Sequence, residues 1–109
     1  MTFKDYQKQS RKTAIYPNVG KNFIYPTLGL AGETGEVVEK IKRILRDKNM
    51  AISEKTKEEL TKEMGDVLWY LAQLATELNL SLDKIASFNI KKLSDRQKRG
   101  KLHGGGDNR

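Results

Sequence analysis

The chain has 109 residues, a length that fits one compact domain. Of these residues 37% are apolar and 32% are charged, and the net charge is +7. It has no cysteine and one histidine, which excludes disulfides, thiolate nucleophiles and cysteine- or histidine-rich metal sites, so any metal must be a hard cation held by carboxylates. No apolar run approaches the ~18 residues of a membrane span and the N-terminus lacks a signal-like stretch, which predicts a cytoplasmic protein without a membrane partner.

Apolar periodicity, capping residues and helix breakers predict four helices and no strands. The expected bounds are 2–13, about 26–47, about 53–78 and about 81–99. Pro17 and Gly20 mark a loop after the first helix, and Asn49 marks a break after the second. Ser53 and Ser81 are the expected N-caps of the last two helices. The predicted fold class is therefore all-α, an antiparallel bundle of about four helices per chain that oligomerises.

Two acidic pairs stand out, Glu33 with Glu36 on the second predicted helix and Glu63 with Asp66 on the third. At about 100° per residue, the first member of each pair lies roughly 80° from the centre of its apolar stripe and the second roughly 140°. The offsets have the same rotational sense. A short connection predicts antiparallel packing, which places both pairs on one side of the helix pair and at nearly the same height. The four carboxylates are therefore expected to converge.

Four converging carboxylates repel one another, and a divalent cation with oxygen ligands relieves that repulsion. Gly32, Gly35 and Gly65 each lower helix propensity by ~1 kcal/mol relative to alanine. They lie beside the acidic pairs, where small residues let a ligand or another helix approach the backbone. The alternative is that the pairs are ordinary surface acids that form ion pairs with Lys40 and Lys62.

The fourth predicted helix places polar residues on its apolar face. Asn89 lies within the stripe and is expected to point inward, and Lys92 and Arg96 follow on nearly the same face, where they would suit phosphate oxygens. The alternative is that Asn89 bonds the backbone while the cations extend to solvent. Tyr70, one turn after the second acidic pair, either stacks on a nucleobase or packs in the core. Trp69 is expected to face outward, which predicts a subunit contact.

The acidic pairs occur in the order E-x-x-E, 26 residues, E-x-x-D, within GLAGETGEVVEKIKR and KEMGDVLWYLAQLA, and N-x-x-K-L-x-x-R follows. This arrangement resembles the MazG-like all-α nucleoside triphosphate pyrophosphohydrolases. The resemblance implies a MazG-like domain over residues 1–100 and a flexible glycine-rich tail over 101–109. It also implies Mg²⁺-dependent hydrolysis of ribo- or deoxyribonucleoside triphosphates to monophosphate and pyrophosphate, a role in cleaning the nucleotide pool, and a homo-tetramer or homo-dimer. Its implied metal ligands are Glu33, Glu36, Glu63 and Asp66.

In this hypothesis, Glu36 is the catalytic base that takes a proton from water, with Mg²⁺ or Mn²⁺ at the site. Tyr70, Asn89, Lys92 and Arg96 bind the nucleoside triphosphate substrate. The alternative is a helical oligomerisation or nucleic-acid-binding module without catalysis, which the net charge favours. However, the chain is basic only at its ends, +4 over 1–21 and +6 over 84–109, and carries −3 over 22–83. A nucleic-acid partner is therefore not expected.

Overall fold

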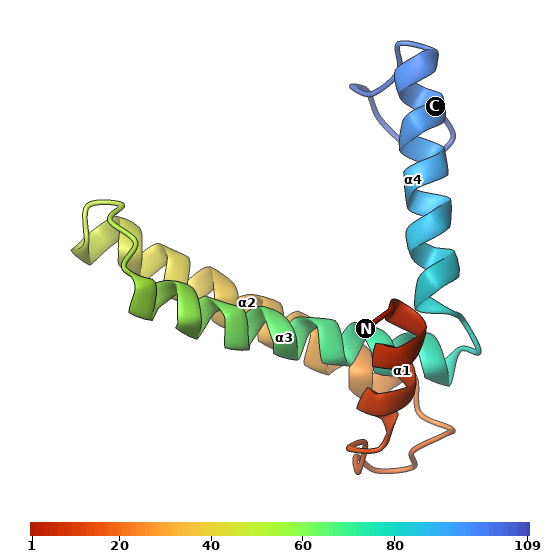
Figure 1. Ribbon diagram of the computed structural model, residues 1–109, viewed down its shortest axis with the longest axis horizontal. Helices are drawn as coiled ribbons and strands as arrows, with labels where there is room; N and C mark the ends of the chain where they lie inside the picture. Colours follow the sequence, from red (N-terminus) through yellow and green to blue (C-terminus); the bar gives the residue numbers. More distant parts are fainter.

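The computed structural model describes residues 1–109 as four helices without strands, which confirms the all-α prediction (Figure 1). The helices are α1 (Phe3–Arg11), α2 (Ile24–Asp47), α3 (Glu54–Glu77) and α4 (Leu82–Lys98). Ser53 and Ser81 cap α3 and α4 as predicted: each Oγ accepts a hydrogen bond from the backbone N–H three residues later, at 3.1 and 3.3 Å. None of the helices combines the length and apolar character that crossing a membrane requires.

α2 begins at Ile24, two residues before the predicted start, and the side chain of Asn22, just before the N-cap Phe23, bonds its first turn. Asn22 Oδ1 accepts a hydrogen bond from the Tyr25 N–H at 3.0 Å, and Asn22 Nδ2 donates to the Pro17 carbonyl at 2.8 Å. Pro26 lies in the first turn, where its missing N–H removes no helical hydrogen bond. Asn22 therefore fixes both the first turn of α2 and the loop that leads into it.

The long helices α2 and α3 lie side by side as a hairpin closed by residues 48–53, where Asn49 adopts a left-handed conformation (φ 49°) (Figure 1). The short helix α1 crosses the end of α3 farthest from this turn. In contrast to the predicted bundle, α4 does not return along the hairpin but extends away from it (Figure 1). Its main packing partner is α1.

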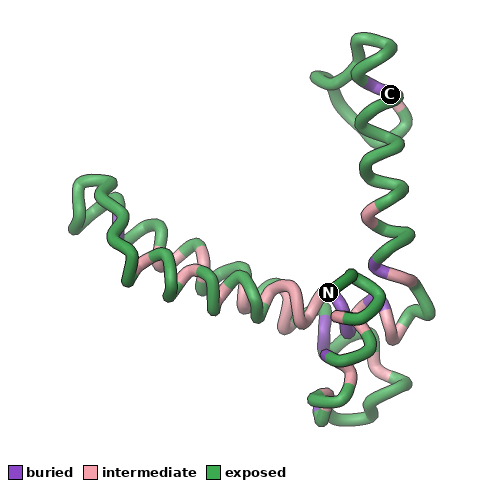
Figure 2. Tube along the Cα trace, in the orientation of Figure 1, coloured by how far each residue is buried: buried purple, intermediate pink, exposed green.

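This open arrangement leaves a small core. Only nine of the 109 residues are buried, and the radius of gyration is 16.8 Å, against about 13 Å for a compact chain of this length. Burial is concentrated where α1, the end of α3 and the start of α4 meet (Figure 2). The apolar cluster at this junction consists of Ala72, Ala75 and Leu82, with Tyr6 and Leu71 packed against it.

Gln7 of α1 fixes the point from which α4 leaves the junction. Its Nε2 donates hydrogen bonds to Thr76 Oγ1 at 3.0 Å and to the Leu80 carbonyl at 2.9 Å. Its Oε1 accepts the N–H of Leu82 at 3.0 Å, one of the N-terminal amides that a helix cannot satisfy internally. One side chain of α1 therefore joins α3, the connecting turn and α4.

A buried carboxylate, that of Glu77, joins α3 to α1 and to the loop at 12–23. Its Oε2 accepts hydrogen bonds from Arg11 Nη2 at 2.6 Å, from the Tyr16 hydroxyl at 2.7 Å and from the Gly20 N–H at 2.8 Å. Its Oε1 accepts the Asn22 N–H at 2.6 Å. The side chain has no exposed area, so these donors replace all of its water. We call these five residues the Glu77 latch.

The donors of the latch lower the pKa of Glu77. Burial alone would raise that pKa, but the hydrogen bonds from Asn22, Tyr16, Arg11 and Gly20 favour the ionised form and bring it to about 2. Because the pKa is lower in the folded than in the unfolded state, ionised Glu77 stabilises the fold above the unfolded pKa near 4.5. That stabilisation, about 3 kcal/mol, is lost as the pH falls toward 2.

We therefore expect wild type to be more stable than Glu77→Gln at pH 7, with a difference that shrinks as the pH falls from about 5 toward 2. Urea unfolding across this pH range measures the difference. The control is Glu54→Gln, which removes a carboxylate whose side chain is 92% exposed and should change stability little at any pH. A difference between wild type and Glu77→Gln that does not vary with pH would contradict the ionised latch.

Candidate active site on the helical hairpin

Three of the four predicted acids meet on the hairpin. Oxygen atoms of Glu33 on α2 and of Glu63 and Asp66 on α3 all lie within 4.8 Å of one another. Glu33 and Glu63 are half-buried and Asp66 is exposed. We call these three residues the acidic cluster. The fourth acid, Glu36, is exposed and lies outside this group of oxygens.

Mutual repulsion within the acidic cluster acts on the ionisation of Glu33. Partial burial raises the pKa of Glu33, and the negative charges of Asp66, Glu63 and Glu36 raise it further. Glu36 therefore acts on the acidic cluster through its charge although its carboxylate does not join it. The arrangement favours protonation or a positive ligand at Glu33.

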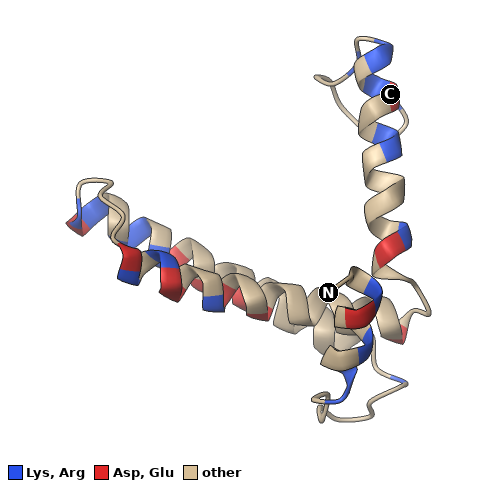
Figure 3. Ribbon diagram, viewed as in Figure 1, with Lys and Arg blue, Asp and Glu red and all other residues tan.

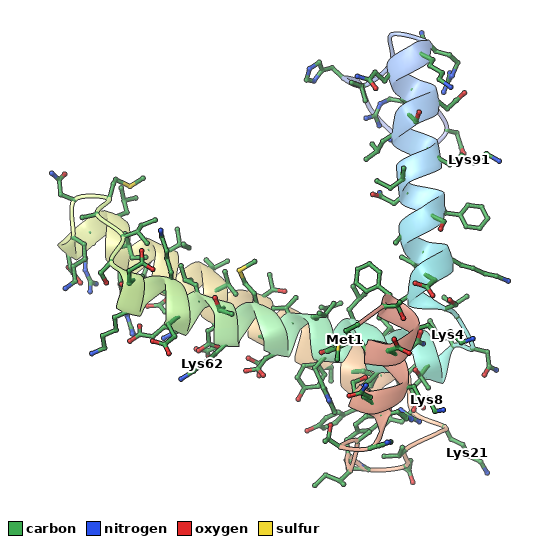
Figure 4. All side chains as sticks on the ribbon, viewed as in Figure 1. Met1, Lys4, Lys8, Lys21, Lys62 and Lys91 are labelled. Atoms are coloured by element: carbon green, nitrogen blue, oxygen red, sulfur yellow. The ribbon has the colours of Figure 1, made fainter.

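The alternative reading of these acids as ion-pair partners applies to one of them. Lys40 Nζ lies 3.7 Å from Glu63 Oε1 and 4.0 Å from Glu59 Oε2. Lys62 forms no ion pair and extends away from the hairpin (Figure 4). Neither Glu33 nor Asp66 has a lysine or arginine within ion-pair distance, so most of the negative charge of the acidic cluster is uncompensated.

The donor set of the acidic cluster fits a hard divalent cation. All of its ligand atoms are carboxylate oxygens, which Mg²⁺ and Mn²⁺ prefer. Two oxygens bound to one Mg²⁺ lie about 3–4 Å apart, given bonds of about 2.1 Å. The oxygens of the cluster, all within 4.8 Å of one another, lie close to this range. The backbone nearby is open, since a Cβ added at Gly32, Gly35 or Gly65 would meet nothing within 4 Å.

Tyr70 lies between the acidic cluster and a group of aromatic side chains. Burial, the neighbouring Tyr25, and the charges of Glu33 and Asp66 together raise its pKa. Its ring lies directly against Gly29, where a Cβ would overlap the ring carbons. Glycine at position 29 is therefore required for Tyr70 to occupy this place.

The aromatic group consists of Tyr16, Tyr25, Trp69 and Tyr70. Tyr16 stacks on Tyr25 with ring centroids 5.2 Å apart, Tyr25 lies 6.4 Å from Tyr70, and Trp69 meets Tyr70 edge-on at 5.0 Å. Trp69, predicted to face outward, packs within the chain instead. Its indole N–H donates to Thr13 Oγ1 at 2.8 Å, because the loop at 12–23 folds over this face of α3.

The predicted substrate residues of α4 are not brought to the acidic cluster. They lie on the helix that extends away from the hairpin, which carries Lys and Arg along its length (Figures 1 and 3). Asn89 is exposed, contrary to the inward position expected, because no part of the chain covers this face of α4. Lys92 Nζ lies 3.1 Å from Asp107 Oδ1, and the buried Arg96 donates to the Asp107 carbonyl at 2.6 Å. The tail thus folds back on these cations.

The sequence analysis missed Gln73 and Glu77. Spacings of four, three and four residues place Asp66, Tyr70, Gln73 and Glu77 along one face of α3. Gln73 is fully buried, donates to Ser10 Oγ at 3.0 Å and accepts from Arg11 at 3.2 Å. The signal in the sequence was that Gln73 and Glu77 are polar residues in a mainly apolar segment and lie on the same helix face as Asp66.

The comparisons with known proteins identify the family of the chain. Residues 26–100 match the family model described as the MazG nucleotide pyrophosphohydrolase domain. The match covers more than half of the chain and includes both acidic pairs, so the chain belongs to the MazG family of nucleotide pyrophosphohydrolases. It is also similar to the Gene 37 protein of Mycobacterium phage L5, at 44% identity over 109 positions that cover 95% of this chain and 96% of the phage protein. No solved structure matches the chain significantly.

Glu63 and Asp66 of α3 differ in their partners, since only Glu63 lies within ion-pair distance of a lysine, and substitutions at the two positions should therefore differ in their effect on stability. Asp66→Asn removes a like charge without breaking an ion pair, so the metal-free variant should melt at the same temperature as metal-free wild type or higher. Glu63→Gln also removes a partner of Lys40 and should gain less. Added Mg²⁺ should raise the melting temperature of wild type more than that of either variant, because ligands that bind only the folded state stabilise it.

Thermal melts with Mg²⁺ and with a chelator measure both effects. If metal-free Asp66→Asn melts well below metal-free wild type, Asp66 is a structural partner and the metal-site interpretation fails.

Proposed function

We propose that the chain hydrolyses ribo- or deoxyribonucleoside triphosphates to the monophosphate and pyrophosphate with Mg²⁺, for which Mn²⁺ can substitute. The observation that carries this proposal is the acidic cluster on the α2–α3 hairpin of a MazG domain. Its members, Glu33, Glu63 and Asp66, would hold the cation. When bound, the cation supplies charge neutralisation at the phosphate oxygens and lowers the pKa of water.

In this proposal Glu36 is the general base. Its carboxylate lies next to the acidic cluster but outside it, so it remains free to accept a proton. It takes a proton from water as the water oxygen bonds to the α phosphorus. The bond from that phosphorus to the bridging oxygen breaks, and pyrophosphate leaves with its electron pair. Tyr70 contacts the nucleoside at the edge of the cluster.

Asn89, Lys92 and Arg96 are proposed to bind the polyphosphate from a second copy of the chain. Positive charge near the leaving pyrophosphate stabilises the transition state. Within one chain α4 extends away from the hairpin, so these residues cannot complete their own acidic cluster (Figure 1). A second copy of the chain would supply them, with Asp107 giving way to phosphate at Lys92 and Arg96.

The exposed apolar surface supports a homo-tetramer or homo-dimer. An open groove of about 610 Å³ runs between α2 and α3, lined by Val37, Met64, Gly65, Leu68 and Leu71, among others. On α4, Phe88 is 73% exposed and Ile90 68% exposed. Soluble monomers rarely leave faces of this kind uncovered. We propose that apolar faces of α4 and the hairpin pack against other copies of the chain.

We expect purified protein with Mg²⁺ to convert nucleoside triphosphates to monophosphate and pyrophosphate, and a chelator to abolish the reaction. Ion-exchange separation of the products after incubation with a panel of ordinary and modified nucleotides measures this. Glu36→Gln should lower kcat by about 10²-fold. The matched control is Glu39→Gln, which removes an acid paired with Lys42 and Arg43 on the same helix.

Release of orthophosphate and a diphosphate would place the attack at the γ phosphate and contradict the proposal. Absence of hydrolysis, with metal-independent oligonucleotide binding that weakens steeply with salt, would instead support a nucleic-acid-binding module.

Sedimentation should give a mass of two or four times the 12.4 kDa chain at micromolar concentration. Phe88→Asp should shift the distribution toward the monomer, because it places a charge in the apolar face of α4. The control is Ile15→Asp, which changes an apolar side chain that is 92% exposed on the loop at 12–23 and should leave the mass unchanged. A wild-type chain that sediments as a stable monomer would contradict the oligomer.

A further inference from the structure

Lysines from the two ends of the chain meet on one side of the molecule. The sequence separates these basic ends, +4 over 1–21 and +6 over 84–109, but α1 packs against α4 and joins them. Lys4, Lys8, Lys21 and Lys91 lie on the side farther from the hairpin turn (Figure 4). We use the term basic edge for six exposed lysines of α1, the loop at 12–23 and α4, namely Lys4, Lys8, Lys21, Lys84, Lys91 and Lys98.

Helical spacing aligns the α4 part of the basic edge. Lys91 and Lys98 follow Lys84 at intervals of seven residues, so each lysine is rotated by only about 20° from the one before it. The three lysines extend over about 21 Å at 1.5 Å per residue. Asn89 and Arg96, proposed above to bind polyphosphate, lie about 150° away around the helix. The basic edge therefore faces away from the side of α4 that is assigned to the substrate.

The α1 part of the basic edge also faces away from the rest of the chain. Tyr6 packs against the apolar cluster and Ser10 is buried, so these two residues mark the inward face of α1. Lys4 and Lys8 are one turn apart and lie roughly 160° around the helix from that face. Both lysines are therefore open to a partner that approaches from outside.

No carboxylate forms an ion pair with a lysine of the basic edge. The ion pairs of α1 and α4 use other cations, namely Arg11, Lys92, Arg96 and Arg99. The nearby acids have roles of their own. Asp5 accepts the N–H of the N-cap Thr2, and Asp83 lies in the first turn of α4, where it complements the helix dipole. The basic edge therefore presents uncompensated positive charge, unlike the hairpin, where acids and bases lie side by side (Figure 3).

An open groove of about 600 Å³ follows the α4 part of the basic edge. Its lining includes Lys91 and Lys98 together with Ser87 and Ser94. Lysines supply positive charge to phosphate groups, and serine hydroxyls donate hydrogen bonds to phosphate oxygens. The small serine side chains let a phosphate backbone come close to the helix between the lysines. Asp95 also lines the groove, but Arg99 Nε lies 2.8 Å from its Oδ2 and compensates its charge.

The side chains of the basic edge favour a nucleic-acid duplex over other polyanions. Binding of a single strand relies on aromatic side chains that stack on the bases, and the basic edge contains none. A duplex carries one negative charge per about 1.7 Å of its axis, so a row of lysines releases many counterions from it. The molecule measures 44 and 41 Å along its two longer axes, the length of about 12 base pairs at 3.4 Å each.

We infer that the basic edge binds double-stranded nucleic acid through its phosphates, without preference for sequence. Phosphate contacts fix a protein on a duplex but carry no sequence information, and lysine stripes of this kind offer no paired donor and acceptor to base edges. The inference goes beyond the proposed function, because no lysine of the basic edge belongs to the acidic cluster or to the substrate residues. A chain bound to a duplex should therefore still hydrolyse nucleotides.

Fluorescence anisotropy with a labelled duplex of about 20 base pairs measures binding to the full chain. With four to six phosphates contacted, log K should fall against log salt with a slope of about −4 to −5. Duplexes of unrelated sequence should bind equally, and a labelled single strand of the same length should bind more weakly. Addition of the duplex should leave the rate of nucleotide hydrolysis unchanged.

The double variant Lys91→Glu/Lys98→Glu reverses two charges of the basic edge. It should weaken duplex binding about 10-fold or more at about 100 mM salt and reduce the salt slope by about 2. The matched control is Lys48→Glu/Lys55→Glu, which changes the net charge equally at the hairpin turn and should weaken binding less than about 3-fold. All four lysines are exposed, and circular dichroism checks that both variants keep the helical content of wild type.

Three results would overturn the inference. The first is wild type that does not bind the duplex at about 50 mM salt. The second is Lys91→Glu/Lys98→Glu that weakens binding no more than the control does. The third is tighter binding of anionic lipid vesicles or of polyglutamate than of the duplex, which would assign the basic edge to a membrane or to an acidic protein. Absence of nucleotide hydrolysis would contradict the proposed function alone, because duplex binding requires no turnover.

Discussion

A carboxylate without exposed area stays ionised only where hydrogen-bond donors replace the water it has lost. Glu77 is such a carboxylate, and the donors that it needs hold one end of the molecule together. The donors come from α1 and from the loop at 12–23, so satisfying one side chain of α3 fixes three segments together. Asn22 links the latch to the first turn of α2, since its N–H binds Glu77 and its side chain accepts the N–H of Tyr25. The base of the hairpin is therefore set by a polar hub more than by an apolar core.

The acidic cluster follows the opposite rule. Glu33, Glu63 and Asp66 place like charges together with one lysine, Lys40, beside them. Such an arrangement opposes folding, and a perturbed acid in this setting favours a functional site over a structural one. The latch and the cluster each include residues of α3, Glu77 in the first and Glu63 and Asp66 in the second, and the aromatic group lies between them. The latch holds the C-terminal end of α3 in place and thereby supports the acidic cluster, where charge repulsion outweighs packing.

Local features of the fold could be predicted from the sequence, and features that depend on distant contacts could not. Ser53 and Ser81 cap their helices through the nearest backbone, so both were visible in the sequence. The direction of α4 depends on Gln7, more than 70 residues before it, and no periodicity reveals that. The convergence of the acids followed from helical spacing, but the exclusion of Glu36 from their oxygens depends on side-chain geometry. Trp69 was misplaced because the loop that covers it has no periodic pattern.

Crystals of the full chain grown with Mn²⁺, analysed by anomalous scattering, test the central claim most directly. The account predicts an anomalous peak bound by oxygens of Glu33, Glu63 and Asp66. The carboxylate of Glu36 should lie near this peak without binding the metal. A peak bound by other residues, or no peak at saturating Mn²⁺ with the acidic cluster paired to lysine, would contradict it.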